Sequence, residues 1–150
     1  MEIMHFEIMS LAQKRYGQIM EPLCQSWQLT RNELDVMLFL ANNPGLDRAV
    51  DIVERRGIAK SHVSLAVSKL ESKGFLERQA DSTDRRTVRL RLTAAASEIV
   101  AQGREIQQQF FGNLFSGISP QELDLWQSMT RKIHRNITTM AKPLADEAAK

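Results

Sequence analysis

The sequence predicts a mainly α-helical protein with a small β-wing, a winged helix-turn-helix flanked by N- and C-terminal helices. Two observations predict this fold class. A helix-like segment over residues 60–73 is closed by Gly74, and two strand-like runs follow at once, residues 75–79 and 87–92. The second run alternates apolar and polar side chains with a period of two, which is typical of a half-buried strand.

Helical spacing predicts a first helix over residues 3–25, with a kink or break at Pro22 because proline lacks an amide hydrogen. Thr30 and Glu33 have the spacing of a capping box for a second helix, which the turn at residues 42–45 ends.

We expect Asp47 to cap a short third helix, which Gly57 closes. We expect Thr93 to cap a long helix over residues 94–115. A second capping box with Pro120 begins the last helix. Its apolar residues recur at three- and four-residue steps: Leu123, Trp126, Met129, Ile133, Ile137 and Met140.

The 150 residues, of which 43% are hydrophobic and 25% charged, suit a single globular domain with a buried core. The net charge of +2 indicates no general affinity for polyanions. However, five arginines stand against two aspartates between Arg78 and Arg91. A local positive excess of this kind is typical of a nucleic-acid site.

Other classes of function lack their motifs. One cysteine, Cys24, excludes an intramolecular disulfide, and His5, His62 and His134 are scattered, so neither a metal nor another cofactor is predicted. No phosphate loop or nucleophile motif indicates an enzyme. The chain shows no signal peptide and no apolar run near the ~20 residues that span a bilayer, so we expect a cytoplasmic protein without membrane contact.

The helix over residues 60–73 has two different faces. Val63, Val67 and Leu70 form an apolar stripe that should pack on the preceding helix. The opposite face is small and polar, so it can enter the major groove, although such a face can also be merely solvated. The predicted DNA-binding face is Lys60, Ser61, His62, Ser64, Leu65, Ser68 and Lys69, with Ser61, His62 and Ser64 on base edges and the two lysines on phosphates.

The tip of the hairpin supplies the second predicted contact, from Asp84, Arg85, Arg86 and Thr87. An arginine at such a tip can enter the narrow minor groove, where the potential is most negative. Asp84 could hold the Arg86 guanidinium in a bidentate pair. The alternative is an exposed turn whose ion pair contributes under about 1 kcal/mol.

These residues resemble the MarR (multiple antibiotic resistance regulator) family. Asp84-Arg85-Arg86, with Leu92-Thr93 downstream, looks like the family's Asp-x-Arg wing signature, and Leu29-Thr30 fits its usual Leu-Thr before the second helix. Residues 70–78 resemble its passage from helix to wing. Ala59 departs from the capping Ser or Asp of the family, at a typical cost of ~1 kcal/mol.

The resemblance implies a homodimeric transcriptional regulator, usually a repressor, that binds double-stranded DNA. By position, Arg86 is the implied minor-groove arginine and Asp84 its partner. The implied organisation is one MarR-like domain over residues 1–150, with a winged helix-turn-helix DNA-binding module at 30–93 and dimerisation helices at 1–28 and 94–150.

Dimerisation has separate support, because the terminal helices carry more apolar surface than a small winged core covers. Two-fold pairing would bury this surface and place two recognition helices about 34 Å apart, on a pseudopalindromic site. The alternative is a monomer with one core. The residues concerned are Ile3, Phe6, Phe110, Phe111, Leu114, Phe115, Leu123, Leu125 and Trp126.

The resemblance also implies release from DNA by a small aromatic or anionic effector, bound between the dimerisation helices and the winged module. Arg15, Tyr16 and Trp27 lie in that region, and a cation beside aromatic rings suits such a compound, although surface and core roles explain them too. Some relatives sense peroxides through a cysteine, so Cys24 is an alternative redox switch; the competing reading is a buried, inert thiol.

A winged-helix module that binds protein is the remaining alternative. Arg86 and the small polar residues of the 60–73 helix favour DNA, because a protein-binding face would more commonly carry exposed aromatic side chains.

Overall fold

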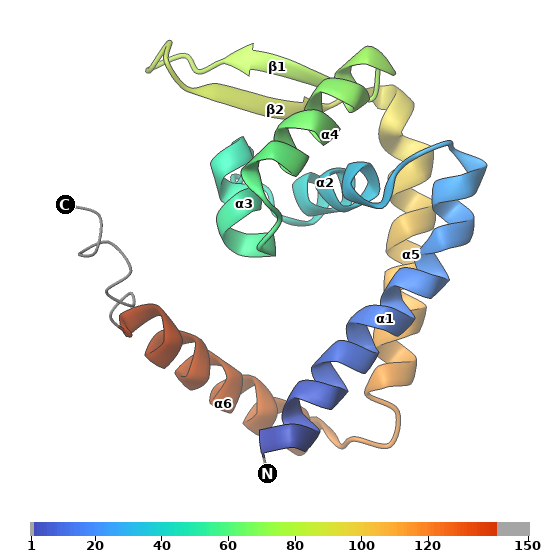
Figure 1. Ribbon diagram of the computed structural model, residues 1–150, viewed down its shortest axis with the longest axis vertical. Coiled ribbons are helices and arrows are strands. Elements are labelled where there is room, and N and C mark those ends of the chain that lie inside the picture. Colours follow the sequence, from blue (N-terminus) through green and yellow to red (C-terminus); the bar gives the residue numbers. More distant parts are fainter. Residues whose placement is uncertain (1, 141–150) are drawn as a thin grey trace, which may run out of the picture. The chain divides into compact units, whose positions relative to one another are not determined.

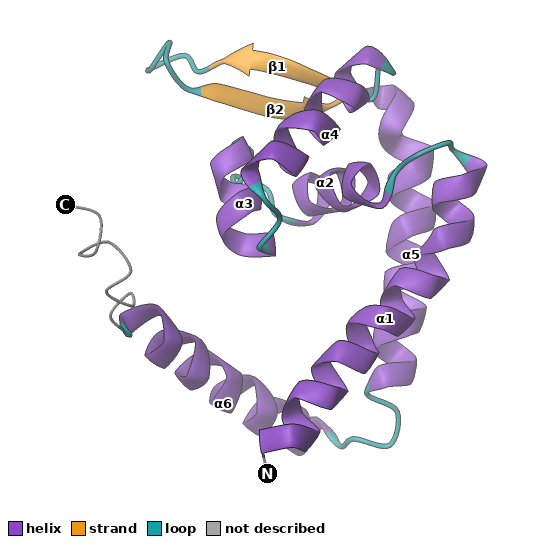
Figure 2. Cartoon of the chain, viewed as in Figure 1, coloured by secondary structure: helices purple, strands orange, loops and turns teal. Residues whose placement is uncertain are grey.

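The computed structural model describes residues 2–140, with side chains from residue 6 onward. It is mostly helical with one two-stranded antiparallel sheet, so the predicted fold class is confirmed (Figures 1 and 2). The elements are α1 (Glu2–Ser26), α2 (Arg31–Asn42), α3 (Ala49–Arg56), α4 (Lys60–Ser72), β1 (Leu76–Ala80), β2 (Val88–Leu92), a 3-10 turn η1 (Ala94–Ala96), α5 (Ser97–Leu114) and α6 (Pro120–Thr139).

The chain divides into two compact units, with the boundary between Phe111 and Gly112 near the end of α5. The first unit holds the winged module, in which α2 packs on α4 and on β2 (Figure 1). Its core follows the predicted helical periods: the apolar faces of α2, α3 and α4 meet Met20 of α1 and Ile99 of α5. The largest fully buried side chains are Met20, Leu34, Met37, Ile52, Leu70, Leu76, Ile99, Val36 and Val63.

The break expected at Pro22 is wrong, because α1 continues through this proline to Ser26. Pro22 removes one helical hydrogen bond, and this loss has to be offset by packing. Met20, Leu23 and Cys24, on both sides of the proline, are buried in the core. This packing holds the segment in helical conformation.

The predicted capping box of α2 is present. The Glu33 amide donates to Thr30 Oγ1 (3.2 Å), and the Thr30 amide donates to Glu33 Oε2 (3.0 Å). The Glu33 carboxylate is only 2% exposed and also accepts a hydrogen bond from Lys73 Nζ (2.7 Å), which donates in addition to the Gln28 carbonyl (2.8 Å). The end of α4 is thereby tied to the turn between α1 and α2.

Two predicted helix caps are wrong. Asp47 does not cap α3: Arg48 occupies that position, and its amide donates to Asp51 Oδ2 (3.0 Å), while the Asp47 carboxylate binds Arg89 of β2. Thr93 occupies the N-cap position of η1, which leads directly into α5, but its side chain forms no cap, because its hydroxyl donates instead to the Gly74 carbonyl (2.6 Å). In both cases a contact with the wing competes for the side chain.

The wing is an antiparallel hairpin whose register runs from Leu76 opposite Leu92 to Ala80 opposite Val88. Leu76 and Leu90 are buried against the helices. Val88, however, is 46% exposed, so the predicted apolar face of β2 is buried only at the end nearer the helices. The hairpin therefore extends outward beyond the core.

The second unit contains α6, which begins with the predicted capping box and Pro120 at its first turn. The Glu122 amide donates to Ser119 Oγ (3.3 Å), and Phe115 packs against Trp126 with ring centroids 5.2 Å apart. No α6 residue is buried within the described part of the chain. None of the described helices is long and apolar enough to cross a membrane. The predicted dimerisation segments, residues 1–28 and 94–150, include the side chain of Ile3 and residues 141–150, which lie outside the described part of the chain.

Gly103 allows α5 to approach α2 closely, and substitution should expose this constraint. A methyl group added at Gly103 would lie 2.7 Å from Leu38 Cδ2, in a buried site. We expect Gly103→Ala to destabilise the fold by about 1 kcal/mol, because overpacking outweighs the ~1 kcal/mol that alanine normally gains in a helix. Thermal or denaturant unfolding measures the change.

Gly112→Ala is the matched control in the same helix, since a methyl there meets no described atom within 4 Å. We expect this variant to be as stable as the parent or slightly more stable. Equal stability of the two variants would contradict the close-packing account.

Candidate nucleic-acid interface

The outer face of α4 consists of side chains that are all exposed, whereas Val63, Ala66, Val67 and Leu70 on the opposite face are buried. All seven predicted DNA-binding residues of this helix therefore lie together on one accessible face: Lys60, Ser61, His62, Ser64, Leu65, Ser68 and Lys69. Ala59 precedes α4 without a side-chain cap, so the first-turn amides have no side-chain acceptor at that position.

Leu65 is the one large apolar side chain on this face, and it is 60% exposed. Ser61 and Ser68 lie four positions before it and three after it, on the same helical stripe. Because serine is short, Leu65 projects beyond both neighbours. Ser68 is also partly engaged, since its hydroxyl accepts a hydrogen bond from Arg78 Nη2 (3.2 Å).

The wing tip is ordered by Asp84, but not in the predicted way. Asp84 Oδ1 accepts a hydrogen bond from the amide of Arg86 (3.0 Å), and Oδ2 accepts one from the Thr87 hydroxyl (3.0 Å). The expected bidentate pair with the Arg86 guanidinium is absent from the ion pairs of the described residues. Asp84 therefore shapes the turn and leaves the arginine side chain available.

The arginines of the predicted positive cluster divide into two groups. Arg78 pairs with Glu71 (2.5 Å), and Arg89 pairs with both Asp81 (2.6 Å) and Asp47 (2.7 Å). Arg85, Arg86 and Arg91 form no ion pair with any residue that the structure describes, and all three are exposed. Two of these three arginines, Arg85 and Arg86, lie at the tip of the wing, and Arg91 lies in β2 opposite Glu77.

The three predicted effector residues do not come together in one pocket. Arg15 is exposed and donates to Gln18 Oε1 (3.2 Å). Tyr16 packs against Phe110 with the two rings tilted by 58°, lies under the Arg31 guanidinium and accepts a hydrogen bond from Gln107. Trp27 packs edge-on to Phe75 and donates to Gln102 Oε1 (3.1 Å). These interactions assign Tyr16 and Trp27 to the packing between helices.

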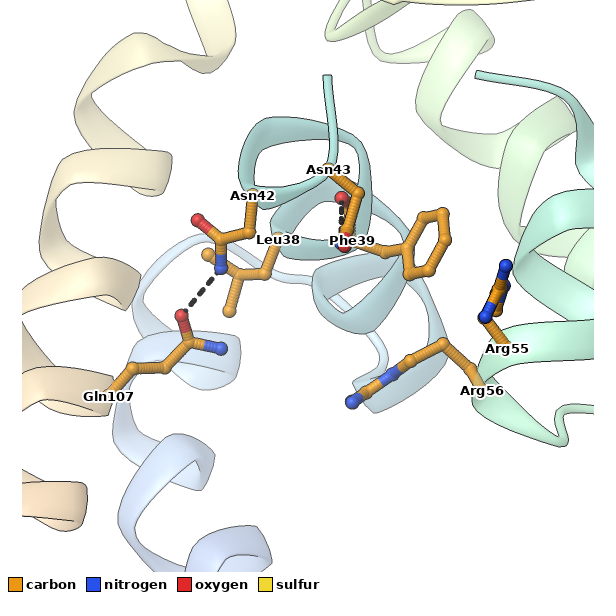
Figure 3. A pocket seen from close by; sticks show the side chains of 7 residues that line it. All are labelled: Leu38, Phe39, Asn42, Asn43, Arg55, Arg56 and Gln107. Carbon is orange, nitrogen blue, oxygen red and sulfur yellow. Dashed lines mark hydrogen bonds between the residues drawn. The ribbon is translucent and has the colours of Figure 1, made fainter. Parts of the chain in front are cut away.

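A cavity of about 250 Å³ lies instead between the ends of α2 and α3 and the facing side of α5 (Figure 3). Phe39 supplies an aromatic wall, and two arginines of α3 supply positive charge. The cavity is lined by Leu38, Phe39, Asn42, Asn43, Arg55, Arg56 and Gln107. Arg55 and Arg56 were not predicted as site residues, because basic residues at a helix end are common and nothing in the local sequence shows that they face a cavity.

Cys24 is buried, with 3% of its surface exposed. Burial raises the pKa of its thiol above the ordinary value, and the positive charge of Arg31 offsets this only in part. Within the described residues, no cluster of three or more His, Cys, Asp or Glu side chains could hold a metal ion.

Comparisons with known proteins agree with this geometry. A sequence profile of the MarR family matches residues 27–87. The transcriptional regulator HosA of Escherichia coli O127:H6 is 26% identical over an alignment of 137 positions, which covers 83% of this chain and 98% of HosA.

Solved structures share the fold. The transcriptional regulator PA3341 has a TM-score of 0.80 at 20% identity, over 91% of this chain and 99% of that protein. The Bordetella bronchiseptica protein BpsR, whose DNA binding is regulated by 6-hydroxynicotinic acid, has a TM-score of 0.64 at 23% identity, over 85% of this chain and 91% of BpsR.

The burial of Cys24 leads to a prediction about its reactivity. A neutral, enclosed thiol reacts slowly, because the thiolate is the nucleophile. We expect alkylation of the folded protein at neutral pH to be at least about 100-fold slower than in denaturant. Modification followed by mass spectrometry measures both rates. Comparable rates in the folded and denatured protein would instead favour a redox switch at Cys24.

Proposed function

We propose that the chain is a DNA-binding transcriptional regulator of the MarR family, a repressor that binds a pseudopalindromic operator as a homodimer. The family and the similar proteins are regulators of transcription, not enzymes. In this proposal residues 30–93 contact DNA, and residues 1–28 and 94–150 pair between two copies.

The observation that carries the proposal is the state of the wing tip. Its two carboxylates are used within the turn, by backbone amides, hydroxyls and Arg89, whereas Arg85 and Arg86 have no carboxylate partner among the described residues. A solvated surface turn has no need to keep its arginines apart from its carboxylates. A tip built to reach the minor groove does, because a paired arginine would have to break its ion pair before meeting phosphate or base.

The exposed face of α4 is the proposed source of the major-groove contacts. We propose that Ser61, His62 and Ser64 meet base edges in the major groove, and that Lys60 and Lys69 bind phosphates. Leu65, which projects among short serines, suits the methyl group of a thymine. No aromatic side chain lies on this face, so it offers little to a protein partner.

Exposed apolar side chains support the homodimer. Along α6, Trp126, Met129, Ile133 and Ile137 recur at helical spacing and are 46–60% exposed. A continuous apolar stripe of this kind normally lies against a partner. A second copy is the proposed occupant, because regulators of this family act as dimers and a two-fold axis matches a pseudopalindrome.

The cavity beside α3 is the proposed effector site. Its volume suits a single ring, its wall includes Phe39, and Arg55 and Arg56 can attract a carboxylate. The likeness to BpsR, which responds to an aromatic acid, points to the same class of compound. Arg56 also approaches Asp35 at 3.4 Å, so an anion there would compete for an existing contact.

Selection of bound sites from a random duplex library tests the function as a whole. The purified protein should enrich a pseudopalindrome whose half-sites lie about one helical turn apart, and its mass in solution should be that of a dimer. Affinity should fall steeply between 50 and 200 mM salt, by about 10³-fold if six or more phosphates are contacted. A folded protein that enriches no sequence would favour the protein-binding alternative.

Arg86→Ala should weaken binding to the selected operator by roughly tenfold or more and leave the dimer intact, because it removes the minor-groove contact alone. Quantitative electrophoretic mobility shifts measure the affinity. Arg91→Ala is the control, since it removes an equal charge from an exposed position of β2. Equal losses in the two variants would reduce the role of Arg86 to general electrostatics.

Arg55→Gln should make operator binding insensitive to an aromatic acid that releases the parent, while affinity without the acid stays near that of the parent. The probe is 6-hydroxynicotinic acid, followed by other aromatic carboxylates, in the same binding assay. Arg15→Gln is the comparison, because Arg15 lies on α1 away from the cavity. If only Arg15→Gln abolishes the response, the effector binds where the sequence predicted.

A further inference from the structure

Arg89 is the second residue of β2, and its guanidinium is held between two carboxylates. Nε donates to Asp81 Oδ2 (2.6 Å), and Nη1 donates to Asp47 Oδ1 (2.7 Å). Asp81 directly follows β1 at the base of the wing tip, whereas Asp47 lies in the loop between α2 and α3. Arg89 therefore connects the wing tip to the helical part of the module.

Asp47 holds β2 in a second way, because its carbonyl accepts a hydrogen bond from the amide of Leu90 (2.7 Å). Asp47 thus holds β2 at two adjacent residues. Its carbonyl binds the amide of Leu90, and its carboxylate binds the guanidinium of Arg89. With Leu90 buried, this end of the hairpin has little freedom to move against α3.

Asp81 connects Arg89 to the residues of the wing tip. Its Oδ1 accepts hydrogen bonds from the amide and hydroxyl of Thr83 (2.8 and 2.6 Å) and from the amide of Asp84 (3.1 Å). The contacts with Thr83, and then that with Arg89, hold the pKa of Asp81 well below its ordinary value. Asp84 in turn accepts from the amide of Arg86. An unbroken series of contacts therefore leads from Arg89 to Arg86.

From this series we propose that Arg89 is a positioning residue of the DNA-binding site, which acts through Arg86. Its bridge from Asp47 to Asp81 sets the place at which the wing tip meets the minor groove. One positive charge between two negative ones offers no net attraction to phosphate, so Arg89 does not serve as a direct contact. The inference rests on the proposed function and specifies how the wing is held for it.

Asp47→Asn separates positioning from charge, because the two accounts predict opposite signs. Loss of a negative charge near DNA should by itself strengthen binding. Loss of the bridge should weaken binding to the selected operator, by about tenfold. Glu77→Gln is the matched control: Glu77 is exposed on β1 opposite Arg91, so its removal alters charge but not the bridge. We expect that control to bind as tightly as the parent or more tightly.

A double-mutant cycle tests the route through Arg86. Arg89→Met should weaken operator binding about tenfold in the parent and by less than about twofold when Arg86→Ala is already present. Arg91→Met is the control of equal charge. Circular dichroism and thermal unfolding establish that each variant is folded, and Arg89→Lys, which keeps the charge but loses the forked geometry, takes the place of Arg89→Met if that variant is not.

The outcomes are distinct. Weaker binding by Asp47→Asn together with non-additive loss in the cycle supports the proposal. Asp47→Asn binding as tightly as Glu77→Gln, or an undiminished effect of Arg89→Met beside Arg86→Ala, overturns it and leaves the proposed function intact. Binding by Arg86→Ala that matches the parent overturns both the positioning role and the wing contact.

Discussion

The buried carboxylate of Glu33 is the interaction on which the winged module depends. It caps α2, and it accepts a hydrogen bond from Lys73 at the point where α4 ends and the chain turns into the wing. A carboxylate with 2% exposure is costly unless it is paired and hydrogen-bonded, so the fold depends on both of its contacts, with the Thr30 amide and with Lys73 Nζ. One residue thereby fixes the end of the recognition helix relative to the α1–α2 turn, and with it the start of the hairpin.

Carboxylates held by hydrogen bonds within the module also shape the wing. Asp81 and Asp84 lie beside several arginines, yet their oxygens are taken by amides, hydroxyls and Arg89, all within the module. Hydrogen bonds within the module thus hold both carboxylates in the turn, and the guanidinium groups of Arg85 and Arg86 form no ion pair with any described residue. Rigid placement of cationic groups matters for DNA recognition, because freezing flexible side chains on binding lowers affinity.

Much of this architecture could be predicted from the sequence, since it depends on local signals. Helical periods gave the buried faces of α2 and α4, Thr30 with Glu33 and Ser119 with Glu122 marked helix starts, and the alternation in residues 87–92 indicated the hairpin. The two helix-cap predictions failed for the same reason. Asp47 and Thr93 have the local character of helix caps, but tertiary partners on the wing take their side chains.

The candidate site shows the same division. Exposure of the α4 face follows from its period, whereas the roles of Asp84 and Arg89 depend on partners up to 42 residues apart in the chain. Residues of three helices line the cavity that contains Arg55 and Arg56, and no local sequence pattern indicates it. Periodicity reports which way a side chain faces; it carries no information about what lies opposite.

The central claim is that α4 and the wing form one surface that reads two adjacent grooves, duplicated by a dimer. Hydroxyl-radical footprinting of the parent protein on its selected operator tests this claim most directly, because the radical reports protection in the minor groove. The account predicts two symmetric halves, each with a minor-groove protection flanking a major-groove contact, centred about one helical turn apart. A single unsymmetrical footprint, or one without minor-groove protection beside the major-groove contacts, would contradict it.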